Sequence, residues 1–236
     1  MDRLDKLIAS SGKATRSEAK IWIKSGRVTV NGVPALSPEQ KCDGAADVVA
    51  VDGIALSYAE HRYIMMHKPA GVLSATEDRE QRTALDLLPD ELRRQGLFPV
   101  GRLDKDVTGL LILTNDGALA HALTAPKKHV PKTYRAEVDG VLDETDAAAF
   151  AEGLVLADGT RCRSAKLEII TADSARVTVY EGKYHQVKRM FAARGKPVTA
   201  LHRERMGGLT LDPSLPPGGW RELTEGDVVK MTESYQ

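Results

Sequence analysis

The sequence predicts an α+β protein: a small helix-plus-hairpin unit, then a larger domain with a central antiparallel or mixed sheet flanked by helices. Near the N-terminus, apolar residues at helical spacing give way to short alternating strands. These strands run into turn signals at Asn31-Gly32 and Asp52-Gly53. Further along, apolar runs of strand length occur at residues 63–66 and 110–113, between segments of helical character. Strands and helices are therefore interspersed along the chain.

The boundary between the two parts is predicted at a short polar stretch around residues 57–61. Polar segments without hydrophobic periodicity are typical of linkers. We therefore predict a first domain over residues 1–56, a linker over 57–62 and a second domain over 63–236. The second domain should contain helical segments at residues 77–96, 118–123 and 145–154.

A helix start is encoded early in the first domain. Thr15 precedes a segment with apolar positions at Ala19, Ile21 and Ile23, and Glu18 follows three residues after Thr15. Ser or Thr at the N-cap with Glu at the third helical position forms a capping box, in which each side chain accepts a hydrogen bond from the other residue's backbone. We therefore predict a helix that begins after Thr15 and ends near residue 25.

Composition excludes several classes of protein. The formal net charge is zero, so the whole chain gives no hint of a nucleic-acid partner. Cys42 and Cys162 lie far apart, which predicts neither a metal site nor a disulfide framework. The N-terminus lacks the apolar core of a signal peptide, and no apolar run reaches the length of a membrane span. We expect a cytoplasmic protein.

Positive charge is nevertheless concentrated in two places. Residues 3–32 contain seven basic residues and two acidic ones, and residues 183–205 contain seven basic residues and one acidic one. We call these segments the N-terminal and C-terminal basic clusters. A local excess of this size is typical of phosphate-binding surfaces, although a solvated helix face is the alternative for the first cluster.

The stretch 101–117 carries the most unusual pattern. Arg102, Asp104, Lys105 and Asp106 place four charges within five positions, directly before the buried strand at 110–113. Charges next to a core need partners or a task, because removing one from water unpaired is costly. On composition alone, a solvated loop with a surface ion pair remains the alternative.

Motifs along the chain resemble those of pseudouridine synthases of the RsuA/RluA superfamily. Residues 101–104 read Gly-Arg-Leu-Asp and are followed by Thr-Gly-Leu at 108–110 and Thr-Asn-Asp-Gly at 114–117. Lys-Thr-Tyr at 132–134, the run 181–191 and Leu-His-Arg-Glu-Arg at 201–205 match in the same order. Val107 stands where the family usually carries Ser or Thr.

The N-terminal segment resembles the S4 (αL-type) RNA-binding domain over roughly residues 2–53. An S4 domain together with the sequence Tyr-His-Gln-Val-Lys-Arg-Met-Phe at 184–191 favours the RsuA-type branch of the superfamily. The resemblance thus implies an RNA-binding domain followed by a catalytic domain.

The resemblance also implies roles for individual residues. Asp104 would be the catalytic carboxylate, acting as nucleophile or as the group that supports cleavage of the sugar–base bond. Tyr134 would stack on the uracil, and Lys188 would supply the cation that favours an ionised Asp104. Residues expected to contact the substrate RNA are Arg102, Lys68, Lys132, His185, Arg189, Arg203, Arg205, Arg3, Arg16, Lys20 and Arg27.

The implied reaction converts a uridine of RNA into pseudouridine. It needs no redox change, hydrolysis or external energy, so we expect neither a cofactor nor a metal. The expected partner is ribosomal RNA, either 16S small-subunit rRNA or a small-subunit assembly intermediate, and the expected state is a monomer. The alternatives are a 23S large-subunit rRNA pseudouridine synthase of the same branch and a non-catalytic rRNA-binding assembly protein.

Overall fold

The structure, a computed structural model, describes residues 1–56 and 61–232. Contacts divide the chain into two compact units. The first comprises residues 1–62 together with 85–98, and the second comprises residues 63–84 together with 99–236. Residues 57–60 of the predicted linker lie outside the described part. The predicted boundary at residue 63 assigns 85–98 to the second domain, whereas their contacts group them with the first unit.

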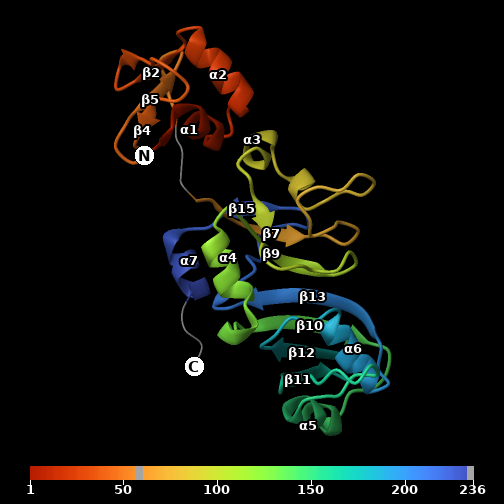
Figure 1. Cartoon of the computed structure of the whole chain (residues 1–236). Helices are drawn as coiled ribbons and strands as arrows, with labels where there is room; N and C mark the ends of the chain where they lie inside the picture. The colour runs from red at the N-terminus through yellow and green to blue at the C-terminus, as the bar shows by residue number, and fades with distance from the viewer. Residues whose placement is uncertain (57–60, 233–236) are drawn as a thin grey trace. The chain divides into compact units, whose positions relative to one another are not determined.

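The first unit combines two helices with short strands (Figure 1). Helix α1 (Leu4–Ser10) is followed by α2 (Arg16–Lys24), whose Thr15–Glu18 capping box is confirmed. Strands β2 (Val28–Val30), β3 (Val33–Pro34), β5 (Val49–Val51) and β6 (Ile54–Ala55) form a sheet in the order β3-β2-β5-β6. β1 (Asp2–Arg3) pairs with β4 (Lys41–Cys42).

The core of this unit forms because helix and strand residues at their predicted spacing point inward. Leu4, Ile8, Ala19 and Val28 are fully buried. The segment 85–98 contributes the turn η1 (Leu85–Leu87) and the short helix α3 (Asp90–Arg93). The Gln95 side-chain amide donates a hydrogen bond of 3.2 Å to the Ser11 carbonyl.

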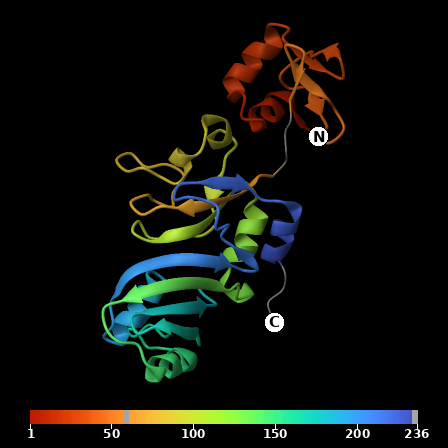
Figure 2. The ribbon, with the colours of Figure 1, turned by 180° about the vertical axis from the view of Figure 1, so that it is seen from behind.

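The second unit contains a large mixed sheet, which confirms the α+β fold (Figures 1 and 2). Within the described residues its main strand order is β11-β12-β10-β13-β9-β7-β15, with β14 paired to β13 and β8 to β9. The bounds are β7 Tyr63–Lys68, β8 Phe98–Pro99, β9 Thr108–Thr114, β10 Lys132–Val138, β11 Lys166–Thr171, β12 Ser174–Val179, β13 Val198–Met206, β14 Leu209–Thr210 and β15 Trp220–Glu222.

The middle of this sheet is joined by a short parallel pairing. β13 runs parallel to β9, with only His202 opposite Thr108 and Arg203 opposite Gly109 in the described register. The neighbouring pairs β10–β13 and β7–β9 are antiparallel. The two antiparallel halves of the sheet therefore meet at Thr108 and Gly109, directly after the charged stretch 102–106.

Helices cover the sheet on the side where its apolar residues gather. α5 (Glu144–Glu152) packs against β11 and α6 (Gln186–Ala193) against β13, while α4 (Gly117–Thr124) packs against α7 (Glu225–Thr232). The turn η2 (Pro126–Lys128) follows α4. Phe150 of α5 and Phe191 of α6 meet with ring centroids 4.9 Å apart. None of the helices in the described ranges is long and apolar enough to span a membrane.

Candidate active site

The charged stretch 102–106 forms a tight loop whose two ends are anchored in the core. Leu103 and Val107 are 6% and 2% exposed, and both belong to the main apolar cluster of the second unit. The Val107 amide donates to the Asp104 carbonyl at 3.1 Å, which closes a turn. Burial of the flanking apolar residues leaves the side chains of Asp104 and Asp106 partly exposed, at 29% and 73%.

The segment 68–74 fixes this loop through hydrogen bonds. The Ser74 hydroxyl and the Leu103 backbone exchange hydrogen bonds, both at 3.0 Å, and the Gly71 amide donates to the Lys105 carbonyl at 2.8 Å. The loop is thus fixed mainly through backbone groups, which leaves the charged side chains available for other interactions.

Lys68 completes this support from a buried position. Its side chain is fully buried, and Nζ donates to the carbonyls of Pro69, Lys105 and Val107 at 3.0, 3.2 and 2.8 Å. Burial lowers the pKa of Lys68 to about 8. We therefore correct the prediction of an RNA contact: Lys68 positions the loop that carries Asp104.

Asp104 faces two basic side chains from the start of α6. His185 Nε2 lies 3.4 Å from Asp104 Oδ1, and Lys188 Nζ lies 3.4 Å from Asp104 Oδ2. The predicted pairing of Lys188 with Asp104 is present in the geometry, but Lys188 is closer to Asp106, at 2.7 and 2.8 Å from its two carboxylate oxygens. One ammonium group therefore bridges two carboxylates.

Asp106 is the residue of this cluster that sequence reasoning did not assign. The Lys188 ammonium lowers the pKa of Asp106 below its ordinary value by hydrogen bonding, so the carboxylate is held ionised. The signal was available in the charge pattern of residues 102–106. However, the pattern alone did not show which of the two carboxylates takes the closer contact with Lys188.

The start of α6 places these basic groups by burying the opposite helix face. Val187, Met190 and Phe191 point into the core, which turns Lys188 toward the loop. The side chain of Gln186 fixes the entry to the helix: Oε1 accepts from the Lys183 amide at 3.0 Å and Nε2 donates to Glu181 at 2.8 Å.

A cavity of about 90 Å³ joins the predicted catalytic residues. Its lining includes Arg102, Asp104, Tyr134, His185 and Lys188. Tyr134 comes from β10 and packs against the apolar core, so its ring is held from one side. Residues from the loop, a central strand and α6 therefore converge on one small space with a carboxylate, an aromatic ring and basic groups.

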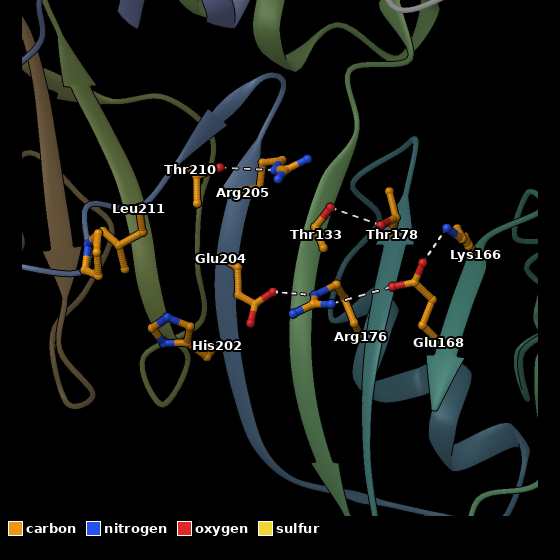
Figure 3. A pocket seen from close by; sticks show the side chains of 11 residues that line it. Thr133, Lys166, Glu168, Arg176, Thr178, His202, Glu204, Arg205, Thr210 and Leu211 are labelled. Atoms are coloured by element: carbon orange, nitrogen blue, oxygen red, sulfur yellow. Dashed lines mark hydrogen bonds and ion pairs between the residues drawn. The ribbon is translucent and has the colours of Figure 1, made fainter. Parts of the chain in front are cut away.

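A larger hollow of about 670 Å³ lies over β10, β11, β12 and β13 (Figure 3). It is lined by side chains that alternate with core-facing neighbours, such as Thr133 beside Tyr134 and Thr178 beside Val179. Its charges are paired across the strands: Arg176 bonds Glu204 at 2.8 Å and lies 3.6 Å from Glu168. The smaller cavity is the better active-site candidate, because its lining includes Asp104, His185 and Lys188, whereas the lining of the larger hollow includes none of them.

Four residues predicted to contact RNA either lie outside the smaller cavity or are engaged in contacts within the protein. Arg205 borders the larger hollow and donates to the Thr210 hydroxyl at 3.2 Å. Arg189 pairs with Asp158 at 2.5 Å and so is not a partner of Asp104. The remaining two, Lys132 and Arg203, are buried.

The burial of Lys132 and Arg203 corrects the prediction that they contact RNA. Lys132 is 9% exposed, its Nζ donates to the Val130 carbonyl at 2.9 Å, and burial lowers its pKa to about 8. Arg203 is 2% exposed and donates from Nε to the Leu110 carbonyl at 2.7 Å. Both side chains direct their charge to backbone carbonyls inside the protein, and Arg203 Nη2 is buried without a hydrogen-bond partner among the described residues.

The N-terminal basic cluster is partly neutralised within its own unit. Arg3 forms two hydrogen bonds of 3.0 Å with the buried Asp5, and Arg16 lies 3.4 Å from the same carboxylate. Arg27 pairs with Asp52 and lies 5.1 Å from the Trp22 ring centroid. Arg16 nevertheless remains 57% exposed, and Lys20 is exposed.

A metal centre has no support in the geometry. Across residues 1–56 and 61–232, no group of three or more His, Cys, Asp or Glu side chains is arranged to hold a metal ion. The groups available at the cavity are the Asp104 carboxylate and neighbouring basic and aromatic side chains.

Comparison with known proteins identifies related sequences. A family model described as RNA pseudouridylate synthase matches residues 62–193, and an S4 domain model matches residues 2–49. An "Uncharacterized RNA pseudouridine synthase YtzG" from Bacillus subtilis is 47% identical over 235 residues, covering 98% of both chains. "Ribosomal small subunit pseudouridine synthase A" from Vibrio cholerae is 44% identical, covering 97% of this chain and 99% of the relative.

The same name is carried by a relative from Escherichia coli that is 42% identical over 231 residues, covering 97% of this chain and 99% of the relative. Among solved structures, "Crystal structure of pseudouridylate synthase" superposes with a TM-score of 0.70 and 37% identity. It covers 98% of this chain and 100% of that chain. The similarity therefore extends over both units.

Proposed function

The chain belongs to the RNA pseudouridylate synthase family and carries an N-terminal S4 domain, and from this premise we propose that it isomerises a uridine in small-subunit 16S ribosomal RNA. Its near full-length similarity to proteins named ribosomal small subunit pseudouridine synthase A supports this substrate. The chain is an RNA pseudouridine synthase; the choice of ribosomal subunit is the proposal. Such a substrate would place the protein in the cytoplasm.

The observation that carries the proposal is the convergence of Asp104, Tyr134 and Lys188 on one cavity. In the isomerisation the bond from the sugar C1′ to the base N1 breaks, the base turns, and a bond from C1′ to C5 forms. N1 gains a proton and C5 loses one, so atoms and charge balance without a cofactor. Of these three residues Asp104 supplies the carboxylate, which faces both His185 and Lys188, and we assign it to the sugar–base cleavage.

Lys188 and Tyr134 support that step in different ways. The Lys188 ammonium lies against both loop carboxylates and so keeps negative charge in place at the cavity. Tyr134 presents a ring held by the core, on which the displaced uracil would stack. Arg102, at the cavity rim, would occupy the space that the extruded nucleotide leaves. All of these groups come from one chain, which supports action as a monomer.

RNA binding is assigned to one residue at the cavity and to exposed groups of the first unit. His185 lines the cavity, and Arg16 and Lys20 are exposed on the S4 unit. A uridine inside folded RNA must leave its stack to reach the cavity, at a cost of a few kcal/mol, so contacts with the surrounding RNA have to offset that cost.

The test is to incubate the protein with small-subunit and large-subunit rRNA precursors, free and in assembly intermediates, and to map pseudouridine. We expect new pseudouridine in small-subunit RNA only. Asp104→Asn is the matched variant: it keeps the shape of the side chain and replaces one carboxylate oxygen by an amide nitrogen, so turnover should be lost while RNA binding persists. Modification confined to large-subunit RNA would refute the proposed substrate, and turnover by Asp104→Asn would refute the assigned carboxylate.

A further inference from the structure

The residues just before α6 include a stacked pair of aromatic rings. The Tyr184 and His185 rings have centroids 3.8 Å apart and planes inclined by 20°. Tyr184 is nevertheless 68% exposed, which is unusual for a large aromatic residue. The stack therefore leaves much of the tyrosine surface open to a partner from solution.

This pair is tied directly to the cavity. His185 lines the cavity and its Nε2 lies 3.4 Å from Asp104 Oδ1. Tyr184 lies against the face of the His185 ring, so the two rings extend from the carboxylate toward solvent. Whatever stacks on Tyr184 is held beside the site of reaction.

The backbone at His185 is held in an uncommon conformation that produces this arrangement. Its φ and ψ are 47° and 33°, in the left-handed region. Such conformations cost non-glycine residues free energy and persist where surrounding contacts impose them, often at functional sites. Here the conformation precedes the first turn of α6 and directs the His185 ring toward Asp104.

We propose that the exposed face of Tyr184 is a stacking site for the base next to the target uridine in the RNA. This rests on the proposed function, because it requires a single nucleotide to be extruded into the cavity. When that uridine leaves its stack, the neighbouring base loses a stacking partner. Aromatic side chains replace such partners in complexes with unpaired RNA. Each base stacked on an aromatic ring contributes about 1–3 kcal/mol to binding.

The alternative is that Tyr184 only supports the His185 ring. The two roles differ in what the RNA must contain. A support role affects every substrate equally, whereas a stacking role disappears when the neighbouring base is absent. An oligonucleotide with an abasic neighbour therefore separates them.

The experiment measures kcat/KM for pseudouridine formation with each combination of three enzymes and three substrates. The enzymes are wild type, Tyr184→Ala and Tyr184→Phe. The substrates are oligonucleotides containing the target uridine with both neighbouring bases, without the 5′ neighbour, or without the 3′ neighbour. We expect Tyr184→Ala to lose roughly 5- to 150-fold on the complete substrate. One abasic substrate should show a similar loss with wild type and no further loss with Tyr184→Ala. Tyr184→Phe keeps the ring and should retain most of the activity.

Tyr180→Ala is the matched control. Tyr180 is 38% exposed, and its neighbours Val179 and Glu181 line the cavity, whereas Tyr180 is not among the lining residues within the described ranges. It should behave as wild type on all three substrates. Equal losses for Tyr184→Ala on complete and both abasic substrates would overturn the stacking site, as would no loss on any of them.

This experiment is kept distinct from the test of the proposed function. Its oligonucleotides are taken from whichever ribosomal RNA the mapping experiment shows to be modified. Modification of large-subunit RNA would overturn the proposed substrate and leave the stacking site open to the same measurement.

Discussion

Replacing Gly109 by Ala should destabilise the junction between the two antiparallel halves of the central sheet. Gly109 lies opposite Arg203 in the short parallel pairing of β9 with β13, and its φ is +107°. A Cβ atom at this position would lie 2.3 Å from the Arg203 carbonyl oxygen and 2.6 Å from its amide nitrogen. These are backbone atoms of a paired strand, so the clash cannot be relieved by rotating a side chain.

The expected loss of stability follows from two contributions. Alanine at positive φ costs about 1–3 kcal/mol. Moving packed strands to admit the extra carbon costs about 1–3 kcal/mol more. The sum is about 2–6 kcal/mol, and for a protein of this size each kcal/mol lowers Tm by about 2–4 °C, which gives a decrease of about 4–24 °C. Turnover measured at temperatures below Tm should also decrease, because the Asp104 loop leads directly into Thr108 and Gly109.

Thermal unfolding followed by circular dichroism measures this effect, with Gly117→Ala as the control. Gly117 begins α4, and no heavy atom lies within 4 Å of its added Cβ. Alanine favours helices over glycine, so this variant should keep or slightly raise Tm. A Gly109→Ala protein with the Tm and turnover of Gly117→Ala would refute the close approach of β9 and β13.

Three further predictions concern charge. Changing Arg16 and Lys20 together to Ala should flatten the slope of log affinity against log salt by roughly one to two units if both touch phosphate, and leave saturated turnover unchanged. Lys188→Met should do the reverse, because its partners are Asp104 and Asp106; a change in slope alone would contradict this. Separately, burial lowers the pKa of Lys132 from 10.5 to about 8, so the unfolded chain binds more protons between these values and stability should rise with pH across that window. Denaturant unfolding of wild type and Lys132→Met at several pH values tests this, and an identical rise in both would count against it.

Local signals in the sequence predicted elements in both units, including the strand β9 that follows the Asp104 loop. The Thr15–Glu18 capping box depends on residues three positions apart, and the apolar run that became β9 is continuous in the chain. Such features are specified by neighbours in sequence. The order of the motifs also predicted that Asp104, Tyr134 and Lys188 share one site. That prediction came from resemblance to a family, because nothing in the local sequence links these three positions.

Whether a basic side chain is buried or exposed could not be predicted in the same way. Lys68, Lys132 and Arg203 were counted as RNA contacts because their charge was visible, yet all three are buried beneath loops or strands. A long side chain can direct its charge to solvent or to a backbone carbonyl several residues away, and the choice depends on tertiary packing. The Lys105 and Val107 carbonyls that accept from the Lys68 ammonium lie 37 and 39 residues away in the chain and come close to it through the pairing of β7 with β9.

The structure also accounts for the departure of Val107 from the family pattern. Its side chain is 2% exposed and packs in the main apolar cluster, so a hydroxyl at this position is not required by solvent or by a visible partner. The hydrogen bonds made at residue 107 come from its backbone: the amide donates to Asp104 and the carbonyl accepts from Lys68. Any residue except proline supplies those two groups. The geometry of the Asp104 loop is therefore compatible with valine, because the turn depends on the backbone of residue 107 and its side chain contributes only packing.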